Sequence, residues 1–154
     1  MSIKPRVTTA VLMSVQGARG DYLSLEMVDG VLYLCCENGG GQIVATYVPP
    51  EGTFFPCDGN WHDILVEKTK NLLTLTVDGE PGEPGLGSYN FPSADTTAPL
   101  FFGGIPDGAS HTGLTTAERF VGCIRDVMLR DDLVNFKEAE NIVGDINVMS
   151  CPAT

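Results

Sequence analysis

Carboxylate and imidazole side chains are the groups in this sequence best able to do acid–base chemistry. A glycoside hydrolase needs two carboxylates about 5–10 Å apart across the scissile bond. Asp63 and Glu67 share one face of an expected strand, but four residues of extended chain would separate them by ~13 Å. His62 and His111 are the only histidines, and the chain contains no G-x-S-x-G, H-E-x-x-H or phosphate-loop pattern. The spacing therefore predicts a non-catalytic protein.

Two aspartates stand near junctions between loops and expected strands. Asp21 directly precedes the expected strand 22–28, and Asp95 precedes a short apolar strand at 100–102. Carboxylates suit a hard cation such as Ca²⁺, but turn aspartates more commonly bond their own backbone. Arg19-Gly20-Asp21 is also an integrin-type triplet. Such triplets arise often by chance, so we do not expect an integrin partner.

The five cysteines are an odd number, so at least one has no partner within the chain. Cys35 and Cys36 are adjacent on an expected strand and should point to opposite faces, one into the core and one outward. Cys57 is either free or paired with one of these two.

Length and composition exclude several classes of protein. The 154 residues suffice for one domain, 1–154, and the net charge of −11 disfavours nucleic acid and a polybasic membrane anchor. No stretch approaches the ~20 apolar residues of a membrane span. The first residues lack the apolar core of a signal peptide, and we expect the chain to be a fragment of a longer protein.

Alternating apolar residues between turn signals predict an all-β, antiparallel sandwich. The clearest hairpin signal is Asp29-Gly30 between two apolar runs. We expect long loops over 80–98 and 106–118 and one helical turn at 137–141. The expected strands are 22–28, 31–36, 42–48, 61–67, 72–77, 100–102 and 120–129.

Three motifs, in order along the chain, resemble those of laminin G-like domains. They are Cys57-Asp58-Gly59-Asn60-Trp61-His62, Phe102-Gly103-Gly104-Ile105-Pro106 and Phe120-Val121-Gly122-Cys123-Ile124-Arg125-Asp126. The segments Ser93–Thr97, Gly113–Thr116 and Ser150–Pro152 are similar to the last G-like domain of laminin α chains. We expect Trp61 to anchor the core and His62 to be structural.

The resemblance implies a jelly-roll (concanavalin-like) sandwich from which one or two N-terminal strands of the family are missing. Such a gap would leave a sheet edge open for pairing with another chain. It also implies a disulfide between Cys123 and Cys151, whose loop of about 28 residues would contribute roughly 3–4 kcal/mol in the chain-entropy model. A disulfide indicates an oxidising, extracellular setting, here secretion into a basement membrane.

The resemblance further implies one Ca²⁺ at the rim of the sandwich. The implied ligands are the side chains of Asp21 and Asp95 and the backbone carbonyls of Asn38 and Ser93. With so few protein ligands we expect weak affinity, near 10⁻⁴ M. A carboxylate that binds the cation cannot readily serve an integrin as well.

The implied function is a matrix adhesion module that contacts cell-surface glycans or receptors of the dystroglycan type, beside a neighbouring G-like domain of the same chain. Lys68, Lys70 and Arg119 are the candidate glycan or sulfate contacts. Because basic residues are sparse, heparin binding should be weak at most. The alternative is an unrelated lectin-like or receptor ectodomain module with the same sandwich fold.

Overall fold

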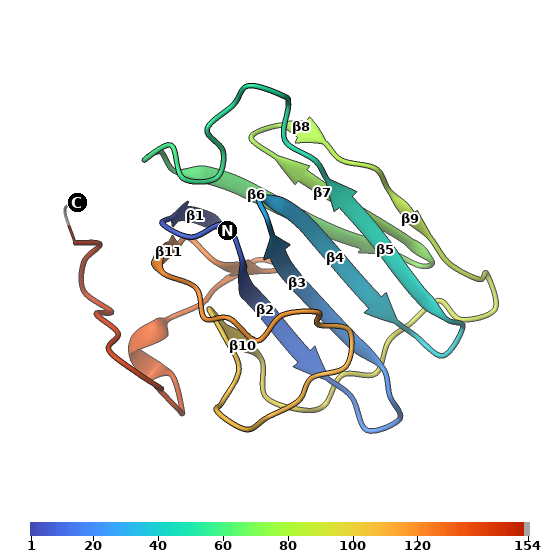
Figure 1. Ribbon diagram of the computed structural model, residues 1–154. Helices are drawn as coiled ribbons and strands as arrows, with labels where there is room; N and C mark the ends of the chain where they lie inside the picture. Colours follow the sequence, from blue (N-terminus) through green and yellow to red (C-terminus); the bar gives the residue numbers. More distant parts are fainter. Residues whose placement is uncertain (153–154) are drawn as a thin grey trace.

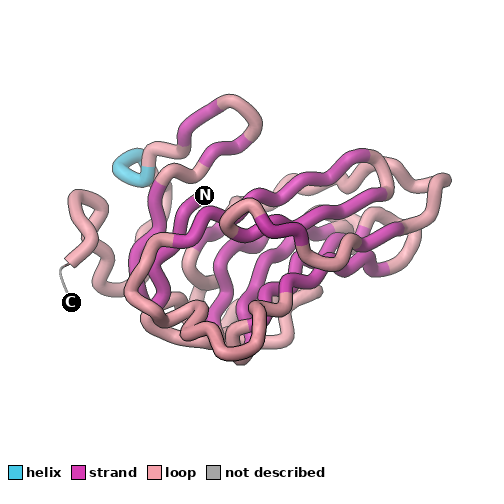
Figure 2. Tube along the Cα trace, turned by 90° about the horizontal axis from the view of Figure 1, so that it is seen from above, coloured by secondary structure: helices cyan, strands magenta, loops and turns pink. Residues whose placement is uncertain are grey.

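Two antiparallel β-sheets packed face to face make up most of the computed structural model, which describes residues 1–152 (Figures 1 and 2). The final two positions of the expected domain, Ala153 and Thr154, lie outside the described residues. In chain order the elements are β1 (Ser2–Pro5), β2 (Ala10–Gln16), β3 (Tyr22–Val28), β4 (Val31–Glu37), β5 (Gln42–Tyr47), β6 (His62–Thr69), β7 (Leu72–Val77), β8 (Glu80–Pro81), β9 (Gly85–Leu86), β10 (Phe101–Phe102), β11 (Gly122–Arg125), β12 (Met128–Leu129), β13 (Asp132–Leu133) and the short 3₁₀ turn η1 (Phe136–Glu138).

One sheet has the order β11-β1-β6-β7-β8, with β9 also paired to β7, and the other has the order β10-β2-β3-β4-β5. The predicted all-β antiparallel sandwich is confirmed. The first strand, β1, lies between β6 and β11, so β11 forms the edge of its sheet on that side. β12 and β13 form a separate small hairpin.

Tight turns set the register of the central strands. Asp29 and Gly30 adopt φ of 50° and 83°, the left-handed conformations of a two-residue hairpin turn, and Val28 pairs with Val31 across them. β6 extends to Thr69, beyond the expected end at 67, and Thr69 pairs directly with Leu72 across the β6–β7 turn.

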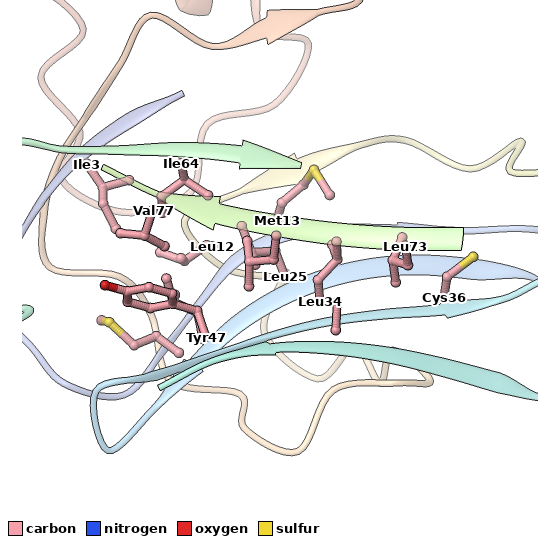
Figure 3. Close-up of a cluster of buried hydrophobic side chains, with 14 of the residues drawn as sticks. Ile3, Leu12, Met13, Leu25, Leu34, Cys36, Tyr47, Ile64, Leu73 and Val77 are labelled. Atoms are coloured by element: carbon pink, nitrogen blue, oxygen red, sulfur yellow. The ribbon is translucent and has the colours of Figure 1, made fainter. Parts of the chain in front are cut away.

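Apolar side chains from the two sheets meet between them to form the core (Figure 3). Ile3 and Ile64 come from one sheet, and Leu12, Leu25 and Leu34 come from the other. All five are at most 4% exposed. Burying such a side chain stabilises the fold by about 1.5–3 kcal/mol, so this layer holds the sheets together.

A loop of residues 106–118, here called the strap, covers the outer face of β2 and β3. Tyr22, Ser24 and Glu26 point to this face and are at most 4% exposed. Glu26 accepts hydrogen bonds from the backbone N–H groups of Thr115 and Thr116 and from the Thr115 hydroxyl, at 2.8–3.1 Å. The alternation of apolar residues in 22–28 is typical of a half-buried strand, but both faces of β3 are buried, because the strap replaces solvent on the outer face.

The strap also changes the expected placement of the adjacent cysteines. Cys36 is fully buried in the core, and Cys35, on the opposite face, is only 5% exposed. The expectation that one of them faces outward is wrong. Both are free, and Cys57 is free and exposed, which excludes a bridge between Cys57 and either of them. The predicted disulfide between Cys123 and Cys151 is confirmed, with Cα atoms 5.6 Å apart.

The last expected strand, 120–129, is interrupted. Asp126 adopts φ 51°, a left-handed conformation that ends β11 and separates it from β12. The helical turn expected at 137–141 is also misplaced, because η1 begins earlier, after the cap Asn135, whose side chain accepts from Lys137 N.

His62, rather than Trp61, is the buried member of the Trp61–His62 pair. Trp61 is half-buried rather than a core anchor, with the Arg125 guanidinium 4.0 Å above its ring centroid. His62 is the buried member, held between Asp78 Oδ2 at 2.8 Å and Asp58 Oδ1 at 3.0 Å. These hydrogen bonds give His62 the structural role that was expected.

Candidate functional site

Asp21 and Asp95 meet at one rim of the sandwich, although 74 positions separate them in the chain. The backbone N–H of Asp95 donates to Oδ2 of Asp21 at 2.8 Å. Asp21 is half-buried immediately before β3, and Asp95 is exposed in the loop before β10. The strand end and the long loop thus bring the two residues to one place.

Strand register places Asn38 beside them. Tyr22 pairs with Glu37 across β3 and β4, so Asp21 and Asn38 occupy the next opposing positions. The buried Asn38 side chain donates from Nδ2 to the carbonyl of Phe91. This bond ties the rim to the loop that carries the other two expected ligands.

The ring of Phe91 packs directly on the glycine turn that follows β4. A Cβ placed on Gly40 would lie 2.8 Å from Cδ2 of Phe91, and one on Gly39 would lie 3.3 Å from Cδ1. The glycine backbone is therefore the surface against which this part of the loop rests.

Ser93 is positioned by its neighbour. The carbonyl of Pro92 accepts a hydrogen bond from Nζ of Lys68 at 2.9 Å, and the same Nζ donates to the carbonyl of Lys70 at 2.7 Å. Ser93 itself is exposed. All four residues expected to bind a cation thus belong to one rim formed by β3, β4 and the loop 88–98.

Gly17 allows the loop to approach this closely. Its N–H donates to the Asp21 carbonyl at 2.7 Å, and a Cβ at position 17 would lie 2.0 Å from the carbonyl oxygen of Asp95. No side chain fits in that space. Nearby, the N–H of Ala98 donates to the carbonyl of Gln16 at 3.0 Å and fixes the far end of the loop.

The donor set fits a hard cation. Within residues 1–152, the Asp95 carboxylate has no hydrogen-bond or ion-pair partner, and Asp21 uses only Oδ2. Oxygen ligands from two carboxylates and two carbonyls match the preference of Ca²⁺. No group of three or more His, Cys, Asp or Glu side chains suited to a metal gathers in the described part of the chain. A site with two acids therefore has to use carbonyl oxygens.

Two charged side chains at this rim affect the pKa of the buried Cys36 thiol. Burial raises the pKa of Cys36, the Asp21 carboxylate raises it further, and the Lys68 ammonium opposes both. Lys68 and Asp21 lie at the same end of the sandwich, because each holds the loop 88–98 by a hydrogen bond.

The three expected glycan-contacting cations do not form one patch. Lys68 and Lys70 lie at the rim, where Lys70 is exposed and Lys68 is half-buried. Arg119 lies beside the start of β2, where it bridges to Val11, and its guanidinium pairs with Asp107 at 2.6 Å. The structure therefore brings only two of the three near the expected cation ligands.

Two features of the rim were missed from sequence. Arg19 and Asp95 line an open hollow together with Ala18, Ala94, Thr96 and Thr97. Arg19 has no carboxylate partner within residues 1–152. Its position two residues before Asp21 was the available signal. Nothing in the local pattern around Gly17 indicated the contact with Asp95.

The histidines do not form a catalytic arrangement. His111 Nδ1 lies 2.7 Å from the Ser14 hydroxyl, a spacing that a serine nucleophile and its base would share. Ser14, however, is 0% exposed beneath the strap, so no substrate reaches it. Burial lowers the pKa of His111, which favours the neutral form of the imidazole.

The chain belongs to the Laminin G domain family, whose model matches residues 3–132. It is 34% identical over 148 residues to laminin subunit alpha-1 of Homo sapiens, covering 94% of this chain and 5% of that protein. It is 33% identical over 150 residues to laminin subunit alpha of Drosophila melanogaster, covering 97% and 4%. The chain thus spans less than a tenth of the length of these relatives.

Solved structures agree with this assignment. Domains LG4-5 of the mouse laminin alpha1 chain superpose with a TM-score of 0.84 at 29% identity, covering 93% of this chain and 39% of that one. The LG1-3 region of the laminin alpha2 chain shares the fold, with a TM-score of 0.72 at 22% identity, covering 92% and 28%. Among residues 1–152 no helix is long and apolar enough to cross a membrane.

Proposed function

We propose that this domain is a non-catalytic adhesion module of the extracellular matrix that binds acidic cell-surface glycans with the help of Ca²⁺. The glycans of receptors of the dystroglycan type are the proposed ligands, and a neighbouring G-like domain of a longer laminin α chain is the proposed structural partner. Membership in the Laminin G domain family supports a role in adhesion. The arrangement of oxygen atoms at the rim supports binding through Ca²⁺.

The observation that carries this proposal is the contact between Asp21 and Asp95. The Asp95 backbone donates to Oδ2 of Asp21, and the three other carboxylate oxygens of the two residues have no hydrogen-bond or ion-pair partner within residues 1–152. A hard cation such as Ca²⁺ would use these free oxygens as ligands, and the two negative charges would balance its charge.

Each residue has a defined part in the proposed site. The Asp21 and Asp95 side chains and the Asn38 and Ser93 carbonyls would hold the cation. When bound, Ca²⁺ supplies a positive centre whose remaining positions accept oxygens of a glycan carboxylate or sulfate. The Arg19 guanidinium, which lines the adjoining hollow, suits a second contact to the same acidic group.

Long-range electrostatics limit the range of ligands. At a net charge of −11 the domain repels polyanions until they reach the rim. Lys70 and Arg119 are candidate sulfate contacts, but they are sparse and Arg119 already pairs with Asp107. We therefore expect heparin to bind weakly, and binding to depend on the cation.

Calcium titration by calorimetry tests the cation site. We expect wild-type protein to bind one Ca²⁺ with a Kd near 10⁻⁴ M, and Asp21→Asn and Asp95→Asn each to weaken binding at least about tenfold, because each loses a charged ligand. Asp29→Asn is the matched control, because Asp29 lies in the turn at the other end of β3 and asparagine tolerates its left-handed backbone. Equal affinity in all four proteins would refute the site.

A glycan array tests the ligand. Sulfated or glucuronate-bearing glycans should bind in Ca²⁺ and be released by EDTA. The Asp95→Asn variant should bind them weakly in either buffer, and Asp29→Asn should behave as wild type. Retention of the same glycans after chelation would contradict the proposed bridging by the cation.

A further inference from the structure

Lys68 has an arrangement that its expected role as a glycan contact does not explain. It is half-buried near the end of β6, and its Nζ donates to two backbone carbonyls, those of Lys70 and Pro92. One carbonyl belongs to the β6–β7 turn and the other to the loop 88–98, so the ammonium joins two separate segments.

The two hydrogen bonds are charge-assisted and use two of the three protons on Nζ, at 2.7 and 2.9 Å. Pro92 has no N–H, so its carbonyl is the backbone group through which this point of the loop can be held. The next residue is Ser93, whose carbonyl is one of the proposed cation ligands.

The loop is then held at three nearby points. Asn38 binds the carbonyl of Phe91, Lys68 binds the carbonyl of Pro92, and Asp21 accepts from the N–H of Asp95. Asn38 and Asp21 are themselves expected cation ligands. Lys68 is the member of the set that brings hydrogen bonds without bringing an oxygen ligand.

We propose that Lys68 is a positioning residue for the cation site, a role that rests on the proposed function. Its ammonium orders the Pro92–Asp95 segment so that the Ser93 carbonyl and the Asp95 carboxylate are in place before the cation arrives. As a charge, however, the same ammonium repels a cation at the rim. The two effects have opposite signs, so substitution separates them.

Calcium titration of Lys68→Met makes the separation. Methionine keeps an unbranched, apolar stem for the half-buried position but donates no hydrogen bond. If Lys68 positions the loop, Ca²⁺ affinity falls about fivefold or more, because ligand oxygens lose their ordering. Lys68→Gln, a second neutral variant with a shorter side chain, should lose Ca²⁺ affinity as well, which shows that the loss is not caused by methionine disturbing β6. Lys68→Arg should keep most of the wild-type affinity. Lys137→Met is the control, because Lys137 is exposed in η1 and its side chain has no hydrogen-bond or ion-pair partner within residues 1–152. An unchanged or raised affinity in both neutral Lys68 variants overturns the proposal.

Hydrogen exchange without metal keeps this test independent of the proposed function. In calcium-free buffer the Asp95 amide should exchange at least about fivefold faster in Lys68→Met than in wild type, because its bond to Asp21 opens more often. The amide of Leu25 in the core strand β3 should be unaffected and reports that the fold is intact. If wild type binds no Ca²⁺ but the Asp95 amide still responds, the proposed function fails, while the ordering of the Pro92–Asp95 segment by Lys68 stands. An Asp95 amide that does not respond overturns the positioning role.

Discussion

At the scale of single residues, the rim depends on the absence of a side chain at position 17. A Cβ at position 17 would lie only 2.0 Å from the carbonyl oxygen of Asp95, which already occupies that space. Gly17 has no unusual backbone angle among those recorded for the chain, so its requirement for glycine is steric rather than conformational. Close packing of backbone against backbone here lets a loop and a strand end share one site.

Gly17→Ala should therefore damage the site while sparing the fold. The added methyl group displaces Asp95 from Asp21, and we expect Ca²⁺ affinity to fall at least about tenfold, since the loop moves by more than a ligand bond tolerates. Calorimetric titration measures the affinity, and thermal unfolding shows whether the core survives.

Gly20→Asn is the control for this change. Nothing lies within 4 Å of a Cβ at position 20, and asparagine tolerates its positive φ of 87° better than other side chains. If Gly17→Ala binds Ca²⁺ as tightly as Gly20→Asn does, the close approach is not essential to the site.

At the scale of elements, the strap turns an outer sheet face into a second buried surface. The carboxylate of Glu26 collects four hydrogen-bond contacts from Thr115 and Thr116, and Ser24 donates to the carbonyl of Gly113. Cys35, directly opposite Ser24 in the register, is shielded on this face. Burial, with the nearby Glu26 charge, raises the pKa of Cys35 to about 11.

Glu26→Gln should loosen the strap. An amide N–H₂ would replace one acceptor and face a backbone N–H, so we expect the free energy of unfolding to fall by about 1–3 kcal/mol. Urea titration measures this change. Glu67→Gln, on the exposed face of β6, should be neutral.

Thiol labelling gives this prediction a local readout. In wild type at pH 8, Cys57 should react at once, and Cys35 should resist because its thiol is covered and protonated. In Glu26→Gln a second thiol should become reactive without urea. Continued protection of Cys35, with an unchanged unfolding midpoint, would show that Glu26 does not hold the strap.

At the scale of the whole molecule, the disulfide and the cation site lie at separate places. The tail after η1 is exposed throughout 139–152 and lies to one side of the sandwich, away from the β2–β3 connection that carries Asp21 (Figure 1). Besides the bridge from Cys151 to Cys123, an Arg6 guanidinium N–H donates to the Pro152 carbonyl at 3.1 Å. The disulfide is therefore the main covalent restraint on the tail.

Replacing both Cys123 and Cys151 with serine should release the tail but leave the rim intact. The loss in unfolding free energy should be at most roughly 3–4 kcal/mol, the chain-entropy value for this loop. Limited proteolysis should cut faster between residues 130 and 150, while Ca²⁺ affinity stays within about twofold of wild type, because distant sites act independently. A large drop in Ca²⁺ affinity would show that tail and rim are coupled.

Much of the sheet structure could be predicted because it depends on local pattern. The alternation in Tyr22–Val28 and the Asp29-Gly30 turn predicted the β3–β4 hairpin, and the resemblance to laminin G-like domains supplied the Cys123–Cys151 pair. The break at Asp126 was missed because a left-handed aspartate leaves no mark in an apolar pattern. The strap was missed because the burial of a sheet face under a loop depends on packing between distant segments, which the local pattern does not contain.

The sequence by itself determined the class of fold and the chemical identity of the groups at the rim, since strand periodicity, turn residues and side-chain types are properties of neighbouring positions. Only the tertiary structure decided that Asp95 reaches Asp21, that Gly17 admits its backbone and that Lys68 holds Pro92. Those contacts join segments up to 78 positions apart, such as Gly17 and Asp95, and packing between distant segments is absent from any local pattern.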